Sequence, residues 1–532
     1  MSERIALIEI DAYDPAIPGV KTLRYCTGLA YRTRPTETPA NALYHPRVQD
    51  PGYWRTEAFT KPGDYGRAMP GEVVLEDADG ALGASLAGLA FDGRKIVIRE
   101  GVRGAAYPAG YVTLINGTVA GAPGFDWGRV TIRMADRMAE LAKPIQPTLY
   151  AGTGSLEGGA DIKGQPKPLV PARGSNIEPM LVSQAKVIYH VSAPIGSAAV
   201  SVAAVRDRGV PIAAGAGSYA NTTDLLNDAL APAAGQYKVL ATVADGTYIR
   251  LGSTPAGRLT CDALYGAAAD RTHAQVIKRL LVHAGIASGD ISAADVTALD
   301  TALPGEIELA IHDAPNAQDV VEQVARSAGC ACYADETGAF RLLRWTAPSG
   351  SPVATLTQTR IEQMDLQDTT ATRDAAPAWR VRLKYARNWT AQADADLAGD
   401  KTNPLDPVSA PGGLTWLAAR AWLAEEWRTV ESADAAVQTA HPKALTVDVE
   451  CLLVDPTAAQ AEADRLLALY KVRRDSTSIA VWLDQAQLNA VRLGAVVTAK
   501  LPRFGYTAGR LMRVAGVTQD RLSGKTNLMV WG

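Results

Sequence analysis

The sequence predicts a mixed β and α+β multidomain protein, in which two small β-barrel domains flank a β unit and an α+β middle domain. Short β-rich runs separated by glycine-containing turns fill residues 71–134, two amphipathic helical repeats follow between residues 272 and 329, and strand-like segments return in the last third. The 532 residues exceed what one hydrophobic core supports, and at about 100–200 residues per domain they predict three to five domains.

Charge and cysteine content narrow the functional classes. The chain has 53 basic and 56 acidic residues and a net charge of −3, so it lacks the basic field that gives non-specific nucleic-acid binding. No apolar run approaches the ~18–20 residues that span a bilayer, and the first residues do not form the apolar core of a signal peptide. We therefore expect a soluble chain made in the cytosol, without membrane insertion. The five scattered cysteines predict reduced thiols.

Residues 71–150, with parts of residues 1–70, are predicted to form the first β-barrel. The turns between its strands are expected at Asp79-Gly80, Asp92-Gly93 and Asn116-Gly117, where glycine can supply a positive φ. Residues 1–70 are otherwise interpreted as an N-terminal arm that wraps a neighbouring subunit, because they contain many prolines together with Tyr53-Trp54 and Asp64-Tyr65-Gly66. The predicted strands of the barrel are Glu72–Leu75, Lys95–Ile98, Tyr111–Val119 and Val130–Arg133.

Residues 151–265 are predicted to be a linker followed by a β unit. Glycine and proline crowd the segment from Pro144 to Pro179, a composition that excludes a long helix or a central strand and marks a domain junction. Strands are then expected at Lys186–Tyr189 and Ala198–Val205, and the unit ends near Cys261.

Residues 266–347 are predicted to form the α+β domain. One helix should begin with Thr272 as N-cap and Gln275 completing a capping box, and should end at Gly285. A second helix is expected from Asn316 to Gly329, and the apolar stripes of both helices should cover a sheet. That sheet should contain the hairpin formed by Cys330–Ala334 and Phe340–Trp345. The predicted stripe residues are Val276, Ile277, Leu280, Leu281, Val320, Val321, Val324, Ala325 and Ala328.

Residues 348–532 are predicted to form the second β-barrel, with a helix insertion that starts at Asp455 as N-cap and Pro456 as first residue. Its last part resembles the first barrel, since Gly93–Arg133 and Gly494–Trp531 both run strand, glycine loop, strand, turn, strand. Two related barrels explain this pattern, and a chance likeness between β-meanders explains it equally well. The segments paired on sequence are Ile96–Ile98 with Ala495–Val497, Tyr111–Val119 with Arg510–Thr518, and Val130–Arg133 with Asn527–Val530.

No motif predicts a catalytic, cofactor-binding or metal site. Gly83–Ala87 departs from a nucleophile elbow at Ala87, and Gly152–Ser155 and Gly524–Thr526 depart from phosphate-binding loops. The six histidines have no zinc-peptidase spacing, and Cys330 and Cys332 share one strand face without two further ligands. Packing is the favoured interpretation for these two cysteines and for the tryptophan cluster Trp416, Trp422 and Trp427.

Three stretches resemble the tail-tip or baseplate central hub proteins of long-tailed bacteriophages, which are related to the hub of contractile tails. The resemblance covers most of the chain from Glu72 to Gly532, and residues 1–69 match less clearly. It is carried by Phe91–Arg94 with Trp127–Arg137; by Gly152–Gly154, Gly158, Asp161–Pro168, Asn176–Pro179, Val187–Tyr189 and Val205–Val210; and by Leu493–Val497, Pro502–Gly505 and Leu528–Gly532.

The resemblance implies a structural virion protein at the distal end of the tail, made in the host cytoplasm. It implies a homotrimer whose six barrels join the sixfold tail tube to threefold tip and fibre proteins, contact the distal tail and tape measure proteins, and surround or close a channel through which DNA passes without specific binding. The resemblance also implies that the chain is not an enzyme and holds no cofactor. The alternatives are a tail-associated cell-wall hydrolase and a carbohydrate-binding receptor module.

Overall fold

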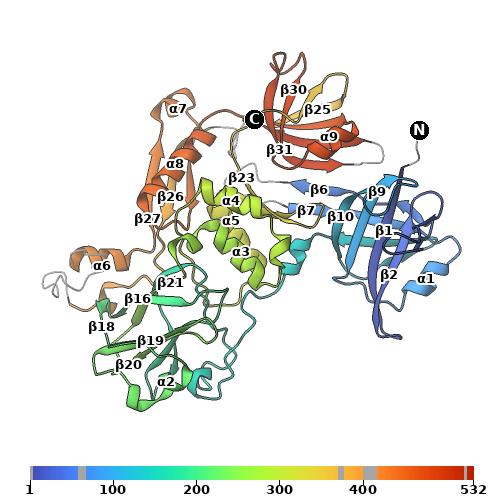
Figure 1. Ribbon diagram of the computed structural model, residues 1–532. Helices are drawn as coiled ribbons and strands as arrows, with labels where there is room; N and C mark the ends of the chain where they lie inside the picture. The colour runs from blue at the N-terminus through green and yellow to red at the C-terminus, as the bar shows by residue number, and fades with distance from the viewer. Residues whose placement is uncertain (1–3, 58–66, 369–376, 400–415, 520–523) are drawn as a thin grey trace.

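The computed structural model describes residues 4–57, 67–368, 377–399, 416–519 and 524–532 (Figure 1). The chain is mixed and mostly β, with several separate sheets, and helices gather in the middle and in the last third. The mixed, β-rich class predicted from the sequence is confirmed. Within these described ranges, every helix is too short or too polar to span a bilayer.

The N-terminal sheet runs in the order β2-β1-β9-β10-β12-β8-β5, with β11 paired to β12. The path curls until its ends meet, because the N–H of Cys26 donates to the carbonyl of His45 (2.8 Å) and the N–H of His45 donates to the carbonyl of Arg24 (3.0 Å). Ile8, Ile96 and other apolar residues fill the space inside. The elements are β1 (Arg4–Asp14), β2 (Gly19–Cys26), β5 (Val48–Asp50), β8 (Glu72–Glu76), α1 (Ala81–Leu86), β9 (Lys95–Val102), β10 (Tyr111–Val119), β11 (Gly124–Asp126) and β12 (Arg129–Ala135).

The first 50 residues do not form an extended arm. Strand β1 pairs with β2 on one side and β9 on the other, so it is a central strand of the N-terminal sheet. The short strands β3 (Tyr31–Arg32) and β4 (Leu43–Tyr44) form a separate two-stranded sheet. The hairpin of β6 (Trp54–Glu57) and β7 (Arg67–Pro70) also leaves the N-terminal sheet, and it lies against β31 (Arg510–Gln519) near the other end of the chain (Figure 1). The predicted Asp64-Tyr65-Gly66 lies outside the described residues. Deleting Met1–Lys61 would therefore remove structural strands.

The predicted turn at Asn116-Gly117 is wrong, since both residues lie inside β10 and Gly117 pairs with Ile96 of β9. The Asn116 side chain instead donates from Nδ2 to the carbonyl of Thr337 (2.9 Å), and its backbone N–H donates to the carbonyl of Glu336 (2.9 Å). This position therefore joins the N-terminal sheet to a hairpin in the middle of the chain.

Residues 173–265 form two small sheets, with strand orders β13-β21-β16-β17 and β14-β15-β20-β19-β18. The glycine- and proline-rich segment before them holds a single 3₁₀ turn at Ser155–Glu157, and β13 lies at a sheet edge, as its composition requires. The elements are β13 (Arg173–Ile177), β14 (Met180–Ser183), β15 (Ile188–Ser192), β16 (Val200–Asp207), β17 (Val210–Pro211), β18 (Ala213–Ala214), α2 (Thr222–Leu226), β19 (Gln236–Thr242), β20 (Gly246–Leu251) and β21 (Leu259–Tyr265).

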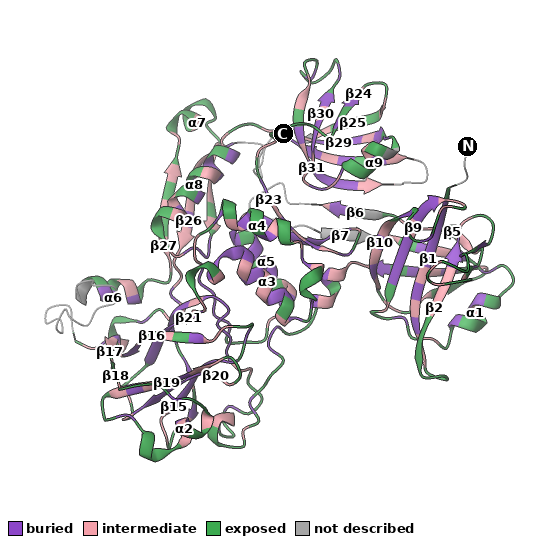
Figure 2. Ribbon diagram, in the orientation of Figure 1, coloured by how far each residue is buried: buried purple, intermediate pink, exposed green. Residues whose placement is uncertain are grey.

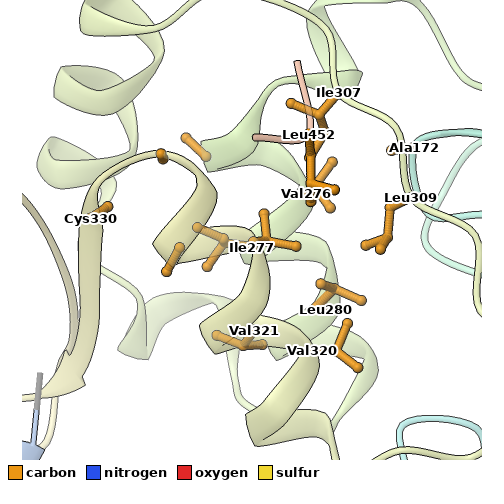
Figure 3. Packing of buried hydrophobic residues seen from close by; sticks show 14 of the residues in the cluster. Ala172, Val276, Ile277, Leu280, Ile307, Leu309, Val320, Val321, Cys330 and Leu452 are labelled. Carbon is orange, nitrogen blue, oxygen red and sulfur yellow. The ribbon is translucent and has the colours of Figure 1, made fainter. Parts of the chain in front are cut away.

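The middle of the chain contains α3 (His273–His283), α4 (Ala293–Ala302), α5 (Ala317–Ser327) and the hairpin of β22 (Cys330–Ala334) and β23 (Phe340–Arg344). Two predicted helices and the hairpin are present, and the apolar stripes of α3 and α5 face each other (Figure 3). The predicted capping box is half formed. Thr272 accepts from the N–H of Gln275, but the Gln275 side chain donates to Asp300 of α4 (2.6 Å).

The sequence did not predict α4, because its small apolar residues are spread over all of its faces and form no clear stripe. Val296 and Leu299 are the only residues of this helix that are buried. Helix α4 packs against α3 and β23, and α5 packs against α3 and β22, so the helix that was not predicted also covers the hairpin.

The C-terminal sheet runs in the order β24-β30-β31-β32-β29-β25, with β6 also paired to β31. The insertion between β25 and β29 is larger than the predicted helix, because it contains the sheet β27-β26-β28 as well as α8, which begins after Asp455 as predicted. The elements are β24 (Ala354–Thr357), β25 (Ile361–Asp368), β26 (Ala378–Tyr385), α6 (Trp416–Ala424), β27 (Arg428–Ala433), α7 (Ala435–Ala440), β28 (Leu445–Glu450), α8 (Pro456–Tyr470), β29 (Ser476–Trp482), α9 (Gln485–Ala490), β30 (Val496–Lys500), β31 (Arg510–Gln519) and β32 (Lys525–Trp531).

Buried residues follow the strands of both large sheets (purple in Figure 2), and each of these sheets has its own hydrophobic cluster. A third cluster is continuous through the two small sheets, the α3–α5 region and the insertion. The predicted 151–265 and 266–347 units therefore share one core. The N-terminal sheet packs around its own cluster, whereas the C-terminal sheet also contributes Ala515 and Trp531 to the shared core.

Candidate functional site

The serine and glycine motifs singled out in the sequence have structural roles. Ser85 lies in α1, and its hydroxyl donates to the carbonyl of Leu82 (3.1 Å). In the loop at Gly152–Ser155, the N–H groups of Gly152 and Gly154 donate to the carbonyls of Glu157 (3.0 Å) and Gly158 (2.7 Å). The loop thus uses these donors internally and does not present them to a phosphate.

Cys330 and Cys332 are both buried on β22. Burial raises the pKa of Cys332 to about 12 and holds that of Cys330 far above its usual value, so both remain neutral thiols. Throughout the described ranges, no group of three or more His, Cys, Asp or Glu side chains is arranged to hold a metal ion.

The tryptophan cluster packs against arginines. The Arg428 guanidinium lies 4.6 Å from the ring centre of Trp422, and the Arg387 guanidinium lies 5.4 Å from Trp427 and 4.4 Å from Trp389. Trp389 borders an open groove of about 920 Å³ beside β14. An aromatic ring at such a groove could bind a sugar, but the ring of Trp389 stacks with the guanidinium of Arg387. The side chain of Trp416 lies outside the described residues.

The feature of this fold that bears on function is a repeated module at its two ends. The N-terminal module is β8-α1-β9-β10-β12 and the C-terminal module is β29-α9-β30-β31-β32. In each, the last strand returns to pair with the first, which gives the sheet orders β9-β10-β12-β8 and β30-β31-β32-β29. The register also agrees, since Arg129 pairs with Glu76 in one module and Lys525 pairs with Trp482 in the other.

Reciprocal backbone hydrogen bonds at the start of β9 and β30 show the same equivalence. Gly93 donates to the carbonyl of Val119 (2.9 Å), and Val119 donates to the carbonyl of Arg94 (2.8 Å). In the C-terminal module, Gly494 donates to Val514 (2.8 Å), and Val514 donates to Ala495 (2.8 Å). Gly93 and Gly494 have φ values of 67° and 80°, a left-handed conformation that explains why glycine occupies both positions.

The other end of each module is fixed by a second matched pair of contacts. Asp77 donates its N–H to the carbonyl of Gly128 (2.8 Å), and Leu483 donates to the carbonyl of Gly524 (3.1 Å). The helix starts differ: Asp484 is the N-cap of α9 and accepts from the N–H of Gln487, whereas α1 begins after Gly80 and the earlier Asp77 accepts from the N–H of Leu82. The two modules therefore share strand order, register and the glycine turn that precedes β9 and β30.

These contacts correct the residue pairing proposed from the sequence. Val119 is equivalent to Val514, whereas the sequence comparison placed it with Thr518. The two modules are alike, but the sequence comparison aligned their strands out of register. The cause is that β31 runs without interruption where the N-terminal module divides the same path into β10 and β11 around Gly121–Pro123.

A buried polar junction joins the β unit to the insertion. Asn176 is fully buried with a φ of 54°, and its Nδ2 donates to the side chain of Asn388 (3.0 Å) and to the carbonyl of Thr390 (2.6 Å). Its backbone N–H donates to Asp262 (2.8 Å), which also accepts two hydrogen bonds from the buried guanidinium of Arg206. This network is the location of Asn176–Pro179, one of the stretches that carried the resemblance.

Glu308 extends the junction to the segment before α5. One carboxylate oxygen accepts from the N–H of Ser175 (2.9 Å), the other interacts with the hydroxyl of Ser175 (2.6 Å), and Arg173 lies 3.6 Å away. Burial of the carboxyl raises the pKa of Glu308 to about 7. A carboxyl whose pKa rises on folding stabilises the protein at low pH, and this contribution disappears as the pH rises through 7.

We expect Glu308→Gln to remove this pH dependence. Glutamine imitates the protonated carboxyl, since its amide can donate to the Ser175 hydroxyl and its oxygen can accept the Ser175 N–H. In the wild type, the Glu308 contribution should add ~2 kcal/mol to the free energy of unfolding between pH 7 and pH 5. Urea unfolding at both pH values should show that the variant lacks this gain. An unchanged pH dependence would contradict the assignment to Glu308.

Sequence reasoning missed the junction, although the sequence contains a signal for it. Asp262 interrupts the apolar run Leu259–Tyr265, and Glu308 interrupts Ile307–Ile311. A lone acidic residue inside a buried strand requires a partner, but the sequence cannot name Arg206 or Ser175 as that partner, because both lie far away along the chain.

No family model matches the chain, and no curated protein matches it either. Among solved structures, the fold is similar to a tail protein from Neisseria meningitidis MC58, with 10% identity, a TM-score of 0.39 and coverage of 99% of this chain and 96% of that chain. It is also similar to the 43 kDa tail protein of prophage MuSo2 from Shewanella oneidensis, with 9% identity, a TM-score of 0.41 and coverage of 99% and 98%. A third similar structure is prophage tail protein gp18 from Listeria monocytogenes EGD-e, with 10% identity, a TM-score of 0.27 and coverage of 55% and 76%.

Proposed function

We propose that the chain is a structural protein of a phage tail, a trimeric hub at the distal end of the tail. The observation that carries the proposal is the repeated module, which gives each chain two like sheets with the same strand order and register. Three copies then present six similar modules, and such a ring can match a sixfold tube on one side and a threefold tip on the other.

The open strands of the C-terminal sheet support assembly. Its path ends at β24 and β25, and in the described residues neither strand has a second neighbour, whereas the N-terminal path closes through the Cys26–His45 contacts. Unpaired strand edges invite pairing with another chain. Contact between unlike modules of neighbouring copies would cover these edges and produce a closed ring.

In this assembly the shared core of the β unit, the helices and the insertion lies between the two modules of each chain. We place the distal tail and tape measure proteins against the ring, and the tip and fibre proteins against this central part. The net charge of −3 is compatible with a lumen that DNA crosses without binding. The role is structural, and the chain itself catalyses no reaction.

The mass of the purified protein in solution tests whether the chain forms a trimer. Light scattering coupled to size exclusion should give three times the 56.1 kDa of one chain, and a reconstruction of tails carrying it should show threefold density below a sixfold tube. A stable monomer that does not associate with tails would reject the hub. A peptidoglycan zymogram separates the hydrolase alternative, because clearing by the purified chain would assign it an enzymatic activity.

A further inference from the structure

The two modules differ at the edge next to their last hairpin. In the C-terminal module, the second half of β31 pairs with β32 on one side and with β6 on the other, so that Thr518 faces Arg55 and Gln519 faces Trp54. In the N-terminal module, the equivalent strand is β11, which pairs with β12 and, among the described residues, with no second strand.

The hairpin turns establish this equivalence. Because Gly128 corresponds to Gly524, the pair Phe125–Val130 of the N-terminal module corresponds to the pair Gln519–Thr526 of the C-terminal module. Phe125 therefore occupies the position whose C-terminal counterpart pairs with Trp54 of β6.

Burial differs in the same sense. All three residues of β11 are exposed, whereas Thr518 and Gln519, the counterparts of Gly124 and Phe125 that pair with β6, are half-buried. The turn after β11 carries Trp127, which is fully exposed, and Phe125 is 46% exposed. Two exposed aromatic side chains beside an unpaired strand are typical of a surface that a partner covers.

The backbone of β11 is also oriented to accept a strand. Asp126 and Arg129 flank the two-residue turn Trp127-Gly128, and the residues that flank such a turn bond to each other. Since the direction of the backbone groups alternates along a strand, the N–H and C=O of Phe125 point away from β12 and toward the open edge.

We propose that β11 is an acceptor edge for a strand from a second copy of this chain, which lies where β6 lies on β31. The donor belongs to the C-terminal sheet of that copy, since β24 and β25 have open edges in the described residues whereas the N-terminal sheet closes on itself. The proposal rests on the hub function and specifies its contact between copies: the β6 hairpin links unlike modules within a chain, and β11 links unlike modules between chains.

Phe125→Pro tests the edge. Proline removes the N–H that faces the partner, and edge strands tolerate proline where the N–H faces outward. Phe125→Thr is the matched control, because it removes the aromatic ring but keeps the N–H and a β-branched side chain. We expect the proline variant to weaken self-association by about tenfold or more relative to the threonine variant, because main-chain hydrogen bonds carry affinity in strand addition. Sedimentation across a concentration series measures this change.

Hydrogen exchange gives a second readout that does not depend on a variant. In the wild type, amides of residues 124–126 should become protected as the concentration rises and copies associate, whereas amides of residues 516–518 should be protected at every concentration because β6 covers them. Equal assembly of the two variants, or unprotected residues 124–126 in the assembled protein, would overturn the proposal while the hub remains. A dimer with protected β11 would support the edge and reject the trimer, and a chain that never associates would reject both.

Discussion

Replacing Asp262 with asparagine is expected to lower the free energy of unfolding by about 3–5 kcal/mol. Asp262 accepts hydrogen bonds from both terminal nitrogens of Arg206, whose side chain is 2% exposed, and from the N–H of Asn176. Asparagine has nearly the same shape, but it leaves the buried guanidinium without a countercharge and turns an amide donor toward it. Urea unfolding followed by tryptophan fluorescence measures the loss, since Trp422 lies 6.0 Å from Arg206.

The matched control is Glu178→Gln, at an exposed ion pair of the same β unit. Glu178 lies 3.4 Å from Arg258, and the two side chains are 54% and 40% exposed. Because water screens such a pair, its removal should cost roughly 0–1 kcal/mol. If Asp262→Asn cost no more than this control, the junction would not hold the β unit and the insertion together.

Acidification from pH 7 to pH 5 is expected to destabilise the chain through its buried histidines. Burial lowers the pKa of His190 and of His273 to about 3, from an ordinary value of 6.5. Each histidine is therefore neutral in the folded protein but binds a proton when the chain unfolds below pH 6.5. The histidine contribution to stability therefore falls as the pH decreases through this window, by roughly 2 kcal/mol per histidine between pH 7 and pH 5.

His190→Gln tests this effect at one of the two positions. His190 stacks on Tyr248 with ring centres 4.3 Å apart, and its Nδ1 lies 2.7 Å from the hydroxyl of Tyr150, a contact that a glutamine amide can retain. Urea midpoints at pH 7 and pH 5 should lie closer together in the variant than in the wild type. Glu308 acts in the opposite direction over the same range, so the double variant with Glu308→Gln separates the two contributions. An unchanged difference between the midpoints in His190→Gln would show that this histidine does not titrate on unfolding.

Much of the local structure follows from short-range signals. The stripe of Val276, Ile277 and Leu280 identified α3, Asp455-Pro456 identified the start of α8, and Gly93 and Gly494 marked equivalent turns. These signals were sufficient because a helix face, a cap and a positive φ depend on residues only a few positions apart. The turn predicted at Asn116-Gly117 was wrong for the same reason, because a dipeptide that suits a turn is also tolerated within a strand that pairs with its neighbours in the sheet.

The sequence by itself determined the β-rich class, the helices α3, α5 and α8 and the β22–β23 hairpin, and it indicated a likeness between the two ends of the chain. Only the tertiary structure decided the register of that likeness, the placement of β6 on β31, the open edge of β11 and the partners of Asp262 and Glu308. Each of these is a contact between residues far apart in the chain, such as Arg55 with Thr518. Strand pairing and buried charge pairs are selected by the packing of the whole molecule, and no local pattern of residues encodes which distant strand or side chain will be the neighbour.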